Sequence, residues 1–154
     1  MKYTFFILLT SMAALLSSAS PCNKKDDRNK IENNNPMANV KIKITVSSQT
    51  FTATLLDNKS AKAFVEMLPL TINMTELNSN EKYYDFANNL PTNSSNPGAI
   101  KNGDLMLYGS KTLVLFYQSF STSYSYTKLG KVDDATGLAS ALGPGNVTIT
   151  FELE

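Results

Sequence analysis

Alternating apolar and polar residues predict β-strands at both ends of the region that follows residue 38. Over 40–46 and 147–153, valine, isoleucine, leucine and phenylalanine occupy every second position, between lysine, threonine and glutamate. Neighbouring side chains of a strand point to opposite faces, so each segment is predicted to have one buried and one wet face. The same period recurs over 51–55 and 70–75, and a shorter strand is predicted over 81–86. There the adjacent rings of Tyr83 and Tyr84 must lie on opposite faces.

Residues 104–126 predict the centre of the fold. Two apolar runs, 105–108 and 113–117, flank the turn sequence Gly109-Ser110-Lys111, which is typical of a β-hairpin. The second run has no polar alternation, which indicates a strand covered on both faces. A further strand is predicted to carry Tyr124 and Tyr126 and to continue to residue 132.

Two short helices interrupt the strands. Asn58 is a good N-cap, and an apolar stripe continues to Leu68 before Pro69 ends the helix. Asp133 and Asp134 are predicted to cap a second helix over 135–142. Residues 87–102, rich in asparagine, predict a long loop without secondary structure, with Leu90 and Ile100 reaching into the core.

Together these segments amount to about eight short strands and two short helices, with connections too short for most parallel crossovers. The predicted fold is mainly β: a closed antiparallel barrel whose open ends are capped by the two helices. Residues 38–154 are expected to form this one domain.

The first 37 residues have the pattern of an export signal and a tether. A positive start, an apolar run over 5–16 and small residues over 17–20 predict a signal peptide over 1–21. The cysteine that follows, Cys22, resembles the acylated cysteine of a bacterial lipoprotein, although Pro21 departs from the usual small residue before it. Cleavage after Ala19 is the alternative, and gives a periplasmic or secreted protein. Residues 22–37 are charged and asparagine-rich, which predicts a flexible tether.

The tether contains a short charged sequence directly after the cysteine. Lys25-Asp26-Asp27 resembles the signal that sends Bacteroidetes-type lipoproteins to the cell surface, and an ordinary solvated linker is the alternative. The expected location is therefore the outer membrane or the cell surface, with the membrane as a partner through a lipid on Cys22.

Composition excludes several kinds of chemistry. The chain has no histidine and no tryptophan, its single cysteine is Cys22, and its only arginine is Arg28. The domain therefore has no residues for a Ser-His-Asp triad, a cysteine nucleophile or a Cys/His zinc site, and no metal or cofactor is predicted. A net charge of +1 for the whole chain gives no basic footprint for nucleic acid.

The acidic residues have ordinary interpretations. Glu76 and Glu81 are predicted to be solvated, and Asp104 to be a turn or strand-start residue. Asp133 and Asp134 are predicted to cap a helix, because no further calcium-ligand spacing follows them.

Three features in order resemble the bacterial cyclophilin-like proteins. Gly103-Asp104 leads the first hairpin strand, 113–117 follows, and Leu129-Gly130 with Val132 precedes a helix containing Gly137-Leu138. Residues 67–70 after the first helix add to the match. The resemblance implies an eight-stranded cyclophilin-like barrel with helices at its mouths, and it implies no activity. True cyclophilins rely on an arginine, a histidine and a tryptophan, and residues 38–154 contain none of these residue types.

The leading functional hypothesis is a non-catalytic binding module, expected to be monomeric, for a peptide or small ligand. Aromatic and apolar side chains could line a groove, with hydroxyl groups to orient the ligand. The predicted ligand-binding residues are Tyr83, Tyr84, Met106, Tyr108, Phe116, Phe120, Tyr124 and Tyr126. The alternative is a peptidyl-prolyl cis-trans isomerase or another small-molecule enzyme of the cell envelope, and in a small barrel such rings can also simply form the core.

Overall fold

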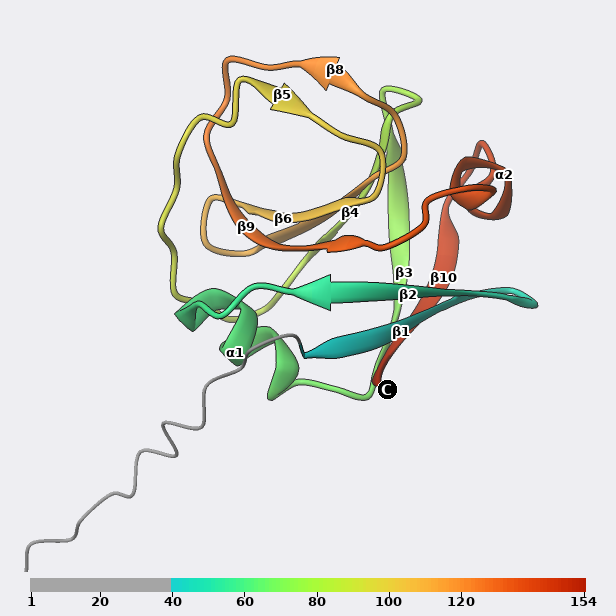
Figure 1. Cartoon of the computed structure of the whole chain (residues 1–154), viewed down its shortest axis with the longest axis horizontal. Helices are drawn as coiled ribbons and strands as arrows, with labels where there is room; N and C mark the ends of the chain where they lie inside the picture. Colours follow the sequence, from blue (N-terminus) through green and yellow to red (C-terminus); the bar gives the residue numbers. More distant parts are fainter. Residues whose placement is uncertain (1–39) are drawn as a thin grey trace, which may run out of the picture. The chain divides into compact units, whose positions relative to one another are not determined.

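The computed structural model describes residues 40–154 (Figure 1). The signal peptide over 1–21, Cys22 and the tether over 22–37 lie outside the described residues. Eight strands close into an antiparallel barrel in the order β1-β10-β3-β4-β7-β6-β9-β2. Their bounds are β1 Lys41–Val46, β2 Gln49–Leu55, β3 Leu70–Leu77, β4 Glu81–Asp85, β6 Asp104–Tyr108, β7 Thr112–Phe116, β9 Tyr126–Val132 and β10 Val147–Leu153. The predicted closed eight-stranded barrel is confirmed.

Closure depends on the two ends of the domain. β1 lies between β10 and β2, and Ile44 of β1 is opposite Phe151 on one side and Phe51 on the other. The inward-facing residues Ile42, Ile44 and Val46 are fully buried. The alternation seen in the sequence therefore sets both the register and the buried face of these strands.

The first helix, α1 (Lys59–Val65), forms as predicted. The Asn58 side chain accepts a hydrogen bond from the backbone N–H of Ala61 at 2.8 Å, which caps the helix. The Phe64 ring is buried, with its centroid 5.6 Å from that of Phe151 in an edge-to-face arrangement. The helix ends at Val65, before the last residue of the predicted apolar stripe.

The second helix is shorter than predicted. α2 (Leu138–Leu142) begins after Gly137, whose positive φ of 81° suits glycine, and no side chain caps it. Asp133 instead accepts hydrogen bonds from Lys41 Nζ and the Thr54 hydroxyl at 3.0 and 2.6 Å. The predicted cap at Asp133 and Asp134 was wrong, because partners on β1 and β2 hold Asp133 outside the helix. Leu138 and Leu142 are buried in the barrel core, as predicted.

The loop over 87–102 was predicted to lack secondary structure, but its last part forms a short strand. β5 (Ala99–Ile100) pairs with β8 (Phe120–Ser121) in a separate two-stranded sheet. In Figure 1 these two strands lie on the opposite side of β6 and β9 from β1 and β2. The predicted plugs, Leu90 and Ile100, are both buried.

The sheet of β5 and β8 helps to cover the outer face of β7, whose inner face packs in the barrel core. Leu113 and Leu115 belong to the core inside the barrel, whereas Val114 and Phe116 belong to an outer cluster with Ile100, Met106 and Tyr126. All four residues of β7 in these two clusters are buried. The prediction from the unbroken apolar run is confirmed, and it reflects a second, outer layer on the barrel wall.

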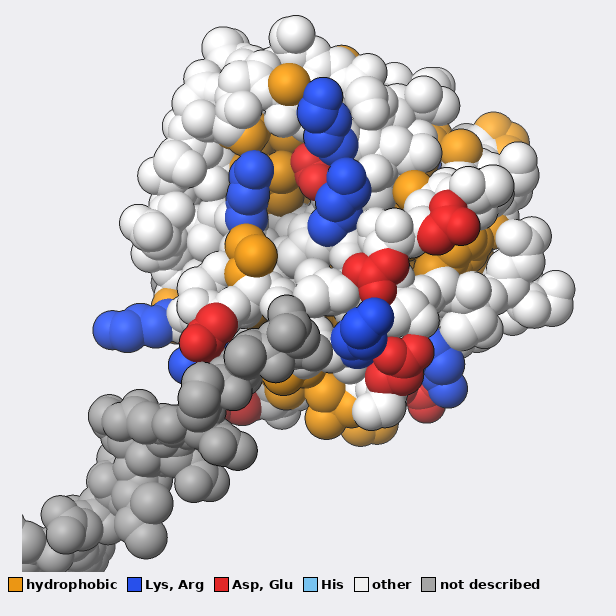
Figure 2. Space-filling view, in the orientation of Figure 1, with side chains coloured by type: hydrophobic (Ala, Val, Ile, Leu, Met, Phe, Trp, Pro, Cys, Tyr) orange, Lys and Arg blue, Asp and Glu red, His pale blue; other side chains and the backbone are white. Residues whose placement is uncertain are grey.

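Charges on the surface are mixed. Lysine and acidic side chains are interspersed on the face drawn in Figure 2, and ion pairs include Lys41–Asp133 and Lys43–Glu152, each at 3.0 Å. This face has no broad single-sign patch of the kind that tracks a nucleic-acid backbone. No helix within residues 40–154 is long and apolar enough to cross a membrane.

Candidate functional site

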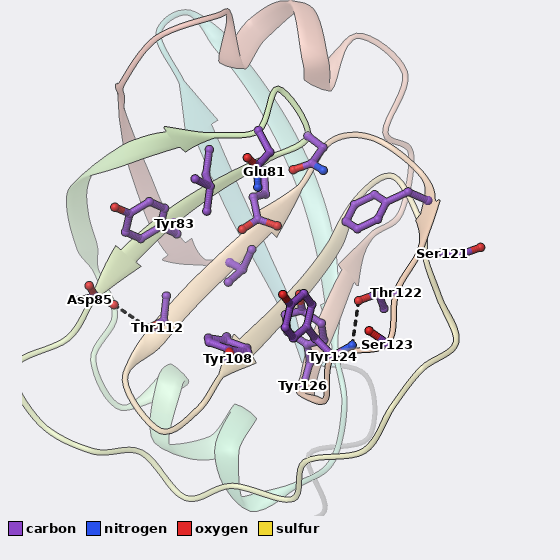
Figure 3. Close-up of a pocket in the computed structure, with 15 residues that line it drawn as sticks. Glu81, Tyr83, Asp85, Tyr108, Thr112, Ser121, Thr122, Ser123, Tyr124 and Tyr126 are labelled. Atoms are coloured by element: carbon purple, nitrogen blue, oxygen red, sulfur yellow. Dashed lines mark hydrogen bonds between the residues drawn. The ribbon is translucent and has the colours of Figure 1, made fainter.

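A pocket lies on the outside of the barrel wall. It has a volume of about 500 Å³ and is bounded by β4, β6 and β7 and by the segment that runs from β8 to the start of β9. Figure 3 shows Tyr108, Tyr124 and Tyr126 gathered on one side of the pocket, with Glu81 on the other side. The volume is in the range of pockets that hold small molecules.

Five of the eight predicted ligand-binding residues come together in this pocket. They are Tyr83, Tyr108, Phe120, Tyr124 and Tyr126. Tyr108 and Tyr124 are well exposed, at 47% and 62% of their surface. Tyr83 and Phe120 are partly buried. The pocket therefore has several accessible rings around one concavity, which is the geometry that a binding groove needs.

The other three predicted residues do not reach the pocket. Tyr84 points to the opposite face of β4 from Tyr83 and packs against the barrel core, with its ring centroid 5.6 Å from that of Phe86. Met106 and Phe116 are buried in the outer cluster beneath the pocket. The alternation of β4 accounts for Tyr84, and the cover from β5 and β8 accounts for the other two.

Ring contacts fix the aromatic wall of the pocket. The Tyr108 centroid is 6.1 Å from that of Tyr124 and 5.6 Å from that of Tyr126. Beneath them, the fully buried Phe116 ring meets Tyr126 edge-to-face at 5.5 Å and Phe120 at 5.7 Å. Phe116 thus supports two pocket rings from behind, so it positions the wall without contacting a ligand.

Two carboxylates face the same pocket, and neither was predicted there. Glu81 and Asp85 precede and follow Tyr83 at alternate positions of β4, so all three share one face. Asp85 accepts a hydrogen bond from the Thr112 hydroxyl at 2.6 Å. Glu81 was predicted to be solvated, and it is half-buried. The period-two spacing around Tyr83 was the signal in the sequence that could have found both carboxylates.

The electrostatics of Glu81 differ from those of a solvated glutamate. Burial raises its pKa above the ordinary value of 4.5, and the charge of Glu76 raises it further. Burial also raises the pKa of the Tyr126 hydroxyl, with a smaller contribution from the charge of Glu81. The charge of Glu81 therefore acts on the Tyr126 hydroxyl.

The residue after Glu81 on β4 is a buried lysine, which the sequence did not predict. Lys82 is completely buried and donates to the Gly143 and Gly145 carbonyl oxygens at 2.7 and 2.6 Å, and also to the Glu76 carboxylate. Its ammonium lies 5.3 Å from the centroid of the Tyr117 ring. Because three acceptors take its three hydrogens, Lys82 holds the turn after α2 against the barrel rather than offering a free amine.

Glu76 and Tyr117 complete this cluster. The Tyr117 hydroxyl donates to both Glu76 carboxylate oxygens, at 2.9 and 2.8 Å. Burial works to raise the pKa of Glu76, but the hydrogen bonds from Lys82 and Tyr117 and the lysine charge outweigh it and lower the pKa. Burial and the neighbouring Glu76 raise the pKa of Tyr117 to about 12. The prediction that Glu76 is solvated was wrong, because Lys82 and Tyr117 enclose it.

Asp104 has the structural role that was predicted. It begins β6, and its carboxylate accepts a hydrogen bond from the backbone N–H of Lys101 at 2.8 Å. Within residues 40–154 no group of three or more acidic, histidine or cysteine side chains is arranged to hold a metal ion.

Comparisons with known proteins agree with this architecture. A model of the cyclophilin-like family matches residues 44–152. The fold is similar to the solution structure of the hypothetical protein AF2241 from Archaeoglobus fulgidus, with a TM-score of 0.58 and 15% sequence identity, over 75% of this chain and 95% of that one. At this identity the likeness shows the fold alone. No curated protein sequence matches the chain.

Proposed function

The chain belongs to the cyclophilin-like family, and from this premise we propose that it is a non-catalytic module that binds a small ligand or a short peptide in the pocket on its barrel wall. The observation that carries the proposal is the pocket of about 500 Å³ whose lining includes four tyrosines and Phe120. Tyrosine offers a large apolar surface together with a hydroxyl that can orient a ligand. Rings that only formed the barrel core would be buried, whereas Tyr108 and Tyr124 are exposed at this pocket.

Catalysis is the weaker alternative because the pocket lacks the groups it would need. Prolyl isomerisation must lower a barrier of about 18–20 kcal/mol, which requires donors aimed at the twisting amide. Residues 40–154 contain no arginine and no histidine, and the buried Lys82 is already occupied by three acceptors. The same shortage argues against another small-molecule enzyme.

NMR that observes the tyrosine ring resonances of the protein, during titration with a fragment library, tests the binding proposal. We expect bound fragments to shift the ring resonances of Tyr108, Tyr124 and Tyr126, and Tyr124→Ser to weaken their binding about tenfold. Leu153→Ser is the matched control, since Leu153 is also an exposed apolar residue but does not line the pocket. Fragments that bind Tyr124→Ser as tightly as the unmodified protein would contradict the proposal.

A proline-peptide isomerase assay tests the non-catalytic part. We expect the rate of isomerisation to equal the uncatalysed rate at micromolar protein. Catalysis that disappears in Tyr124→Ser but persists in Leu153→Ser would overturn this part and favour the isomerase alternative.

The proposal also includes export and attachment to a membrane through Cys22, with residues 22–37 as the tether of a monomeric module at the outer membrane or cell surface. The apolar run over 5–16, followed by small residues and the cysteine, supports it. Mass spectrometry of the mature N-terminus should find an acylated Cys22, and Cys22→Ala should release the protein from the membrane fraction. An unmodified N-terminus at Ser20 would contradict the anchor and favour a periplasmic or secreted form.

A further inference from the structure

The charged side chains that line the pocket are all of one sign. Among the described residues, the pocket lining contains the carboxylates of Glu81 and Asp85 and no lysine. The lining also contains no arginine and no histidine, so none of its side chains can carry a positive charge at neutral pH. The pocket therefore presents negative charge to whatever occupies it.

Glu81 is the carboxylate without a partner. Within residues 40–154 it forms no ion pair and accepts no hydrogen bond, whereas the acidic side chains of Glu76 and Asp85 are both engaged. The side-chain oxygen of Asn80, which also lines the pocket, is buried with no hydrogen-bond donor beside it. A buried amide oxygen without a donor is costly, and a half-buried carboxylate loses part of its hydration. A ligand that supplies a positive charge and hydrogen-bond donors would offset both costs.

The tyrosine rings across the pocket from Glu81 fit the same occupant. Tyr108 and Tyr124 meet nearly at right angles, 88° between ring planes, beside Tyr126. The face of a tyrosine ring attracts a cation that lies within about 6 Å of its centroid, and such contacts recur where proteins recognise organic ammonium ions. The pocket thus combines an anionic group with several aromatic rings.

We infer that the ligand of this pocket is a small organic ammonium ion, with its charge between the Glu81 carboxylate and the tyrosine rings and its apolar body against Phe120 and Val114. The inference rests on the proposed binding function and names the chemical class of the ligand. Asp85, which accepts a hydrogen bond from Thr112, adds a second negative charge to the pocket lining.

Three probes of nearly the same shape test the charge alone: phenylbutylammonium, phenylbutanol and phenylbutanoate, each with its polar group at the chain end. The protein has no tryptophan to mask tyrosine fluorescence, and four of the six tyrosines within residues 40–154 line the pocket. The assigned ring resonances of those four tyrosines report on the pocket itself. We expect the ammonium to bind at least about fivefold more tightly than the alcohol, from a partly exposed ion pair together with a cation–π contact. The carboxylate should bind most weakly.

Glu81→Gln should bring the ammonium and the alcohol within about twofold of each other. Glu66→Gln is the matched control, because Glu66 is an exposed glutamate that does not line the pocket. In the unmodified protein, the preference for the ammonium should also decline as the pH falls through the pKa of Glu81. Of the titratable groups that interact with Glu81, Glu76 on β3 raises its pKa. Tyr117 after β7 and Tyr126 on β9 have raised pKa values, so their hydroxyls stay neutral where Glu81 titrates.

The outcomes separate this inference from the proposed function. If the alcohol or the carboxylate binds as tightly as the ammonium and shifts the same tyrosines, the pocket binds ligands but the inferred charge is wrong. A preference for the ammonium that survives in Glu81→Gln also overturns the inference. If none of the three probes shifts Tyr108, Tyr124 or Tyr126, both the inference and the proposed binding function fail.

Discussion

Two glutamates on the same β-hairpin have opposite surroundings. Glu76 on β3 lies directly across from Lys82 on β4, and the next pair along the hairpin is Leu77 with Glu81. Side chains alternate between the two faces of a strand. Glu76 and Lys82 therefore point to the inner face of the barrel wall, and Glu81 points to the pocket on the outer face. The first carboxylate receives hydrogen bonds from Lys82 and Tyr117, and the second receives none from the described residues.

The different surroundings of the two glutamates indicate different roles, a structural one for Glu76 and ligand binding for Glu81. Hydrogen bonds to a buried charge offset the free energy of removing it from water, so the Glu76 cluster can hold β3, β4 and the turn after α2 together. Glu81 keeps part of its desolvation cost, which raises its pKa. A partly desolvated carboxylate with a raised pKa, at the wall of a pocket, is typical of a group that interacts with a ligand.

The largest expected effect comes from breaking the Glu76 cluster. Lys82→Met keeps the length of the side chain but leaves the Glu76 carboxylate and the Gly143 and Gly145 carbonyls without their donor. We expect the free energy of unfolding to fall by about 3 kcal/mol, as measured by urea denaturation.

Lys111→Met is the control for this change, because Lys111 is exposed. It should alter stability by less than about 0.5 kcal/mol. A loss below about 1 kcal/mol in Lys82→Met would mean that water replaces the lysine easily, and that the cluster does not hold the turn.

A smaller loss is expected from the barrel wall at Gly130. A Cβ atom there would lie 2.9 Å from the Leu55 Cα and closer still to the Thr54 carbonyl oxygen, so β9 and β2 would have to move apart. Gly130→Ala should lower the free energy of unfolding by about 2 kcal/mol and leave ligand binding unchanged.

Gly145→Ala is the matched control, since an added Cβ meets nothing within 4 Å at that glycine. Thermal unfolding followed by circular dichroism would compare the two variants. Equal melting temperatures would show that the strands adjust around the added methyl group without cost.

The smallest expected effect has the opposite sign. Because the pKa of Glu81 is raised in the folded protein, its ionised form is less favourable there than in the unfolded chain. Glu81→Gln should therefore stabilise the domain at neutral pH, by less than about 1 kcal/mol after allowance for solvent screening.

The pH dependence gives this prediction its check. The stability deficit of the unmodified protein is present above the folded pKa of Glu81 and disappears as the pH falls below the ordinary value of 4.5. Urea denaturation at a series of pH values should show the two proteins converging in acid. A variant that is less stable than the unmodified protein at neutral pH would mean that Glu81 contributes to folding.

The sequence by itself determined the barrel. The strict alternation over 40–46 and 147–153 defines a buried face wherever the strand sits, and the apolar run over 113–117 requires cover on both sides. Asn58 likewise caps its helix through a contact three residues away. Each of these signals is local, so it can be interpreted without knowing what lies next to it in space.

Five rings of the pocket were predicted from the sequence, but only the tertiary structure decided how the pocket is enclosed and where the Lys82 cluster forms. β5 and β8 are two residues long and form because each gives the other a partner, so neither has a period in the sequence. Lys82 is buried because its acceptors arrive from β3 and from the turn after α2, more than sixty residues further along the chain. Glu81 stands five residues after Glu76, and nothing in that spacing tells which of the two finds a lysine. The burial and charge of a side chain depend on segments that meet only when the barrel closes.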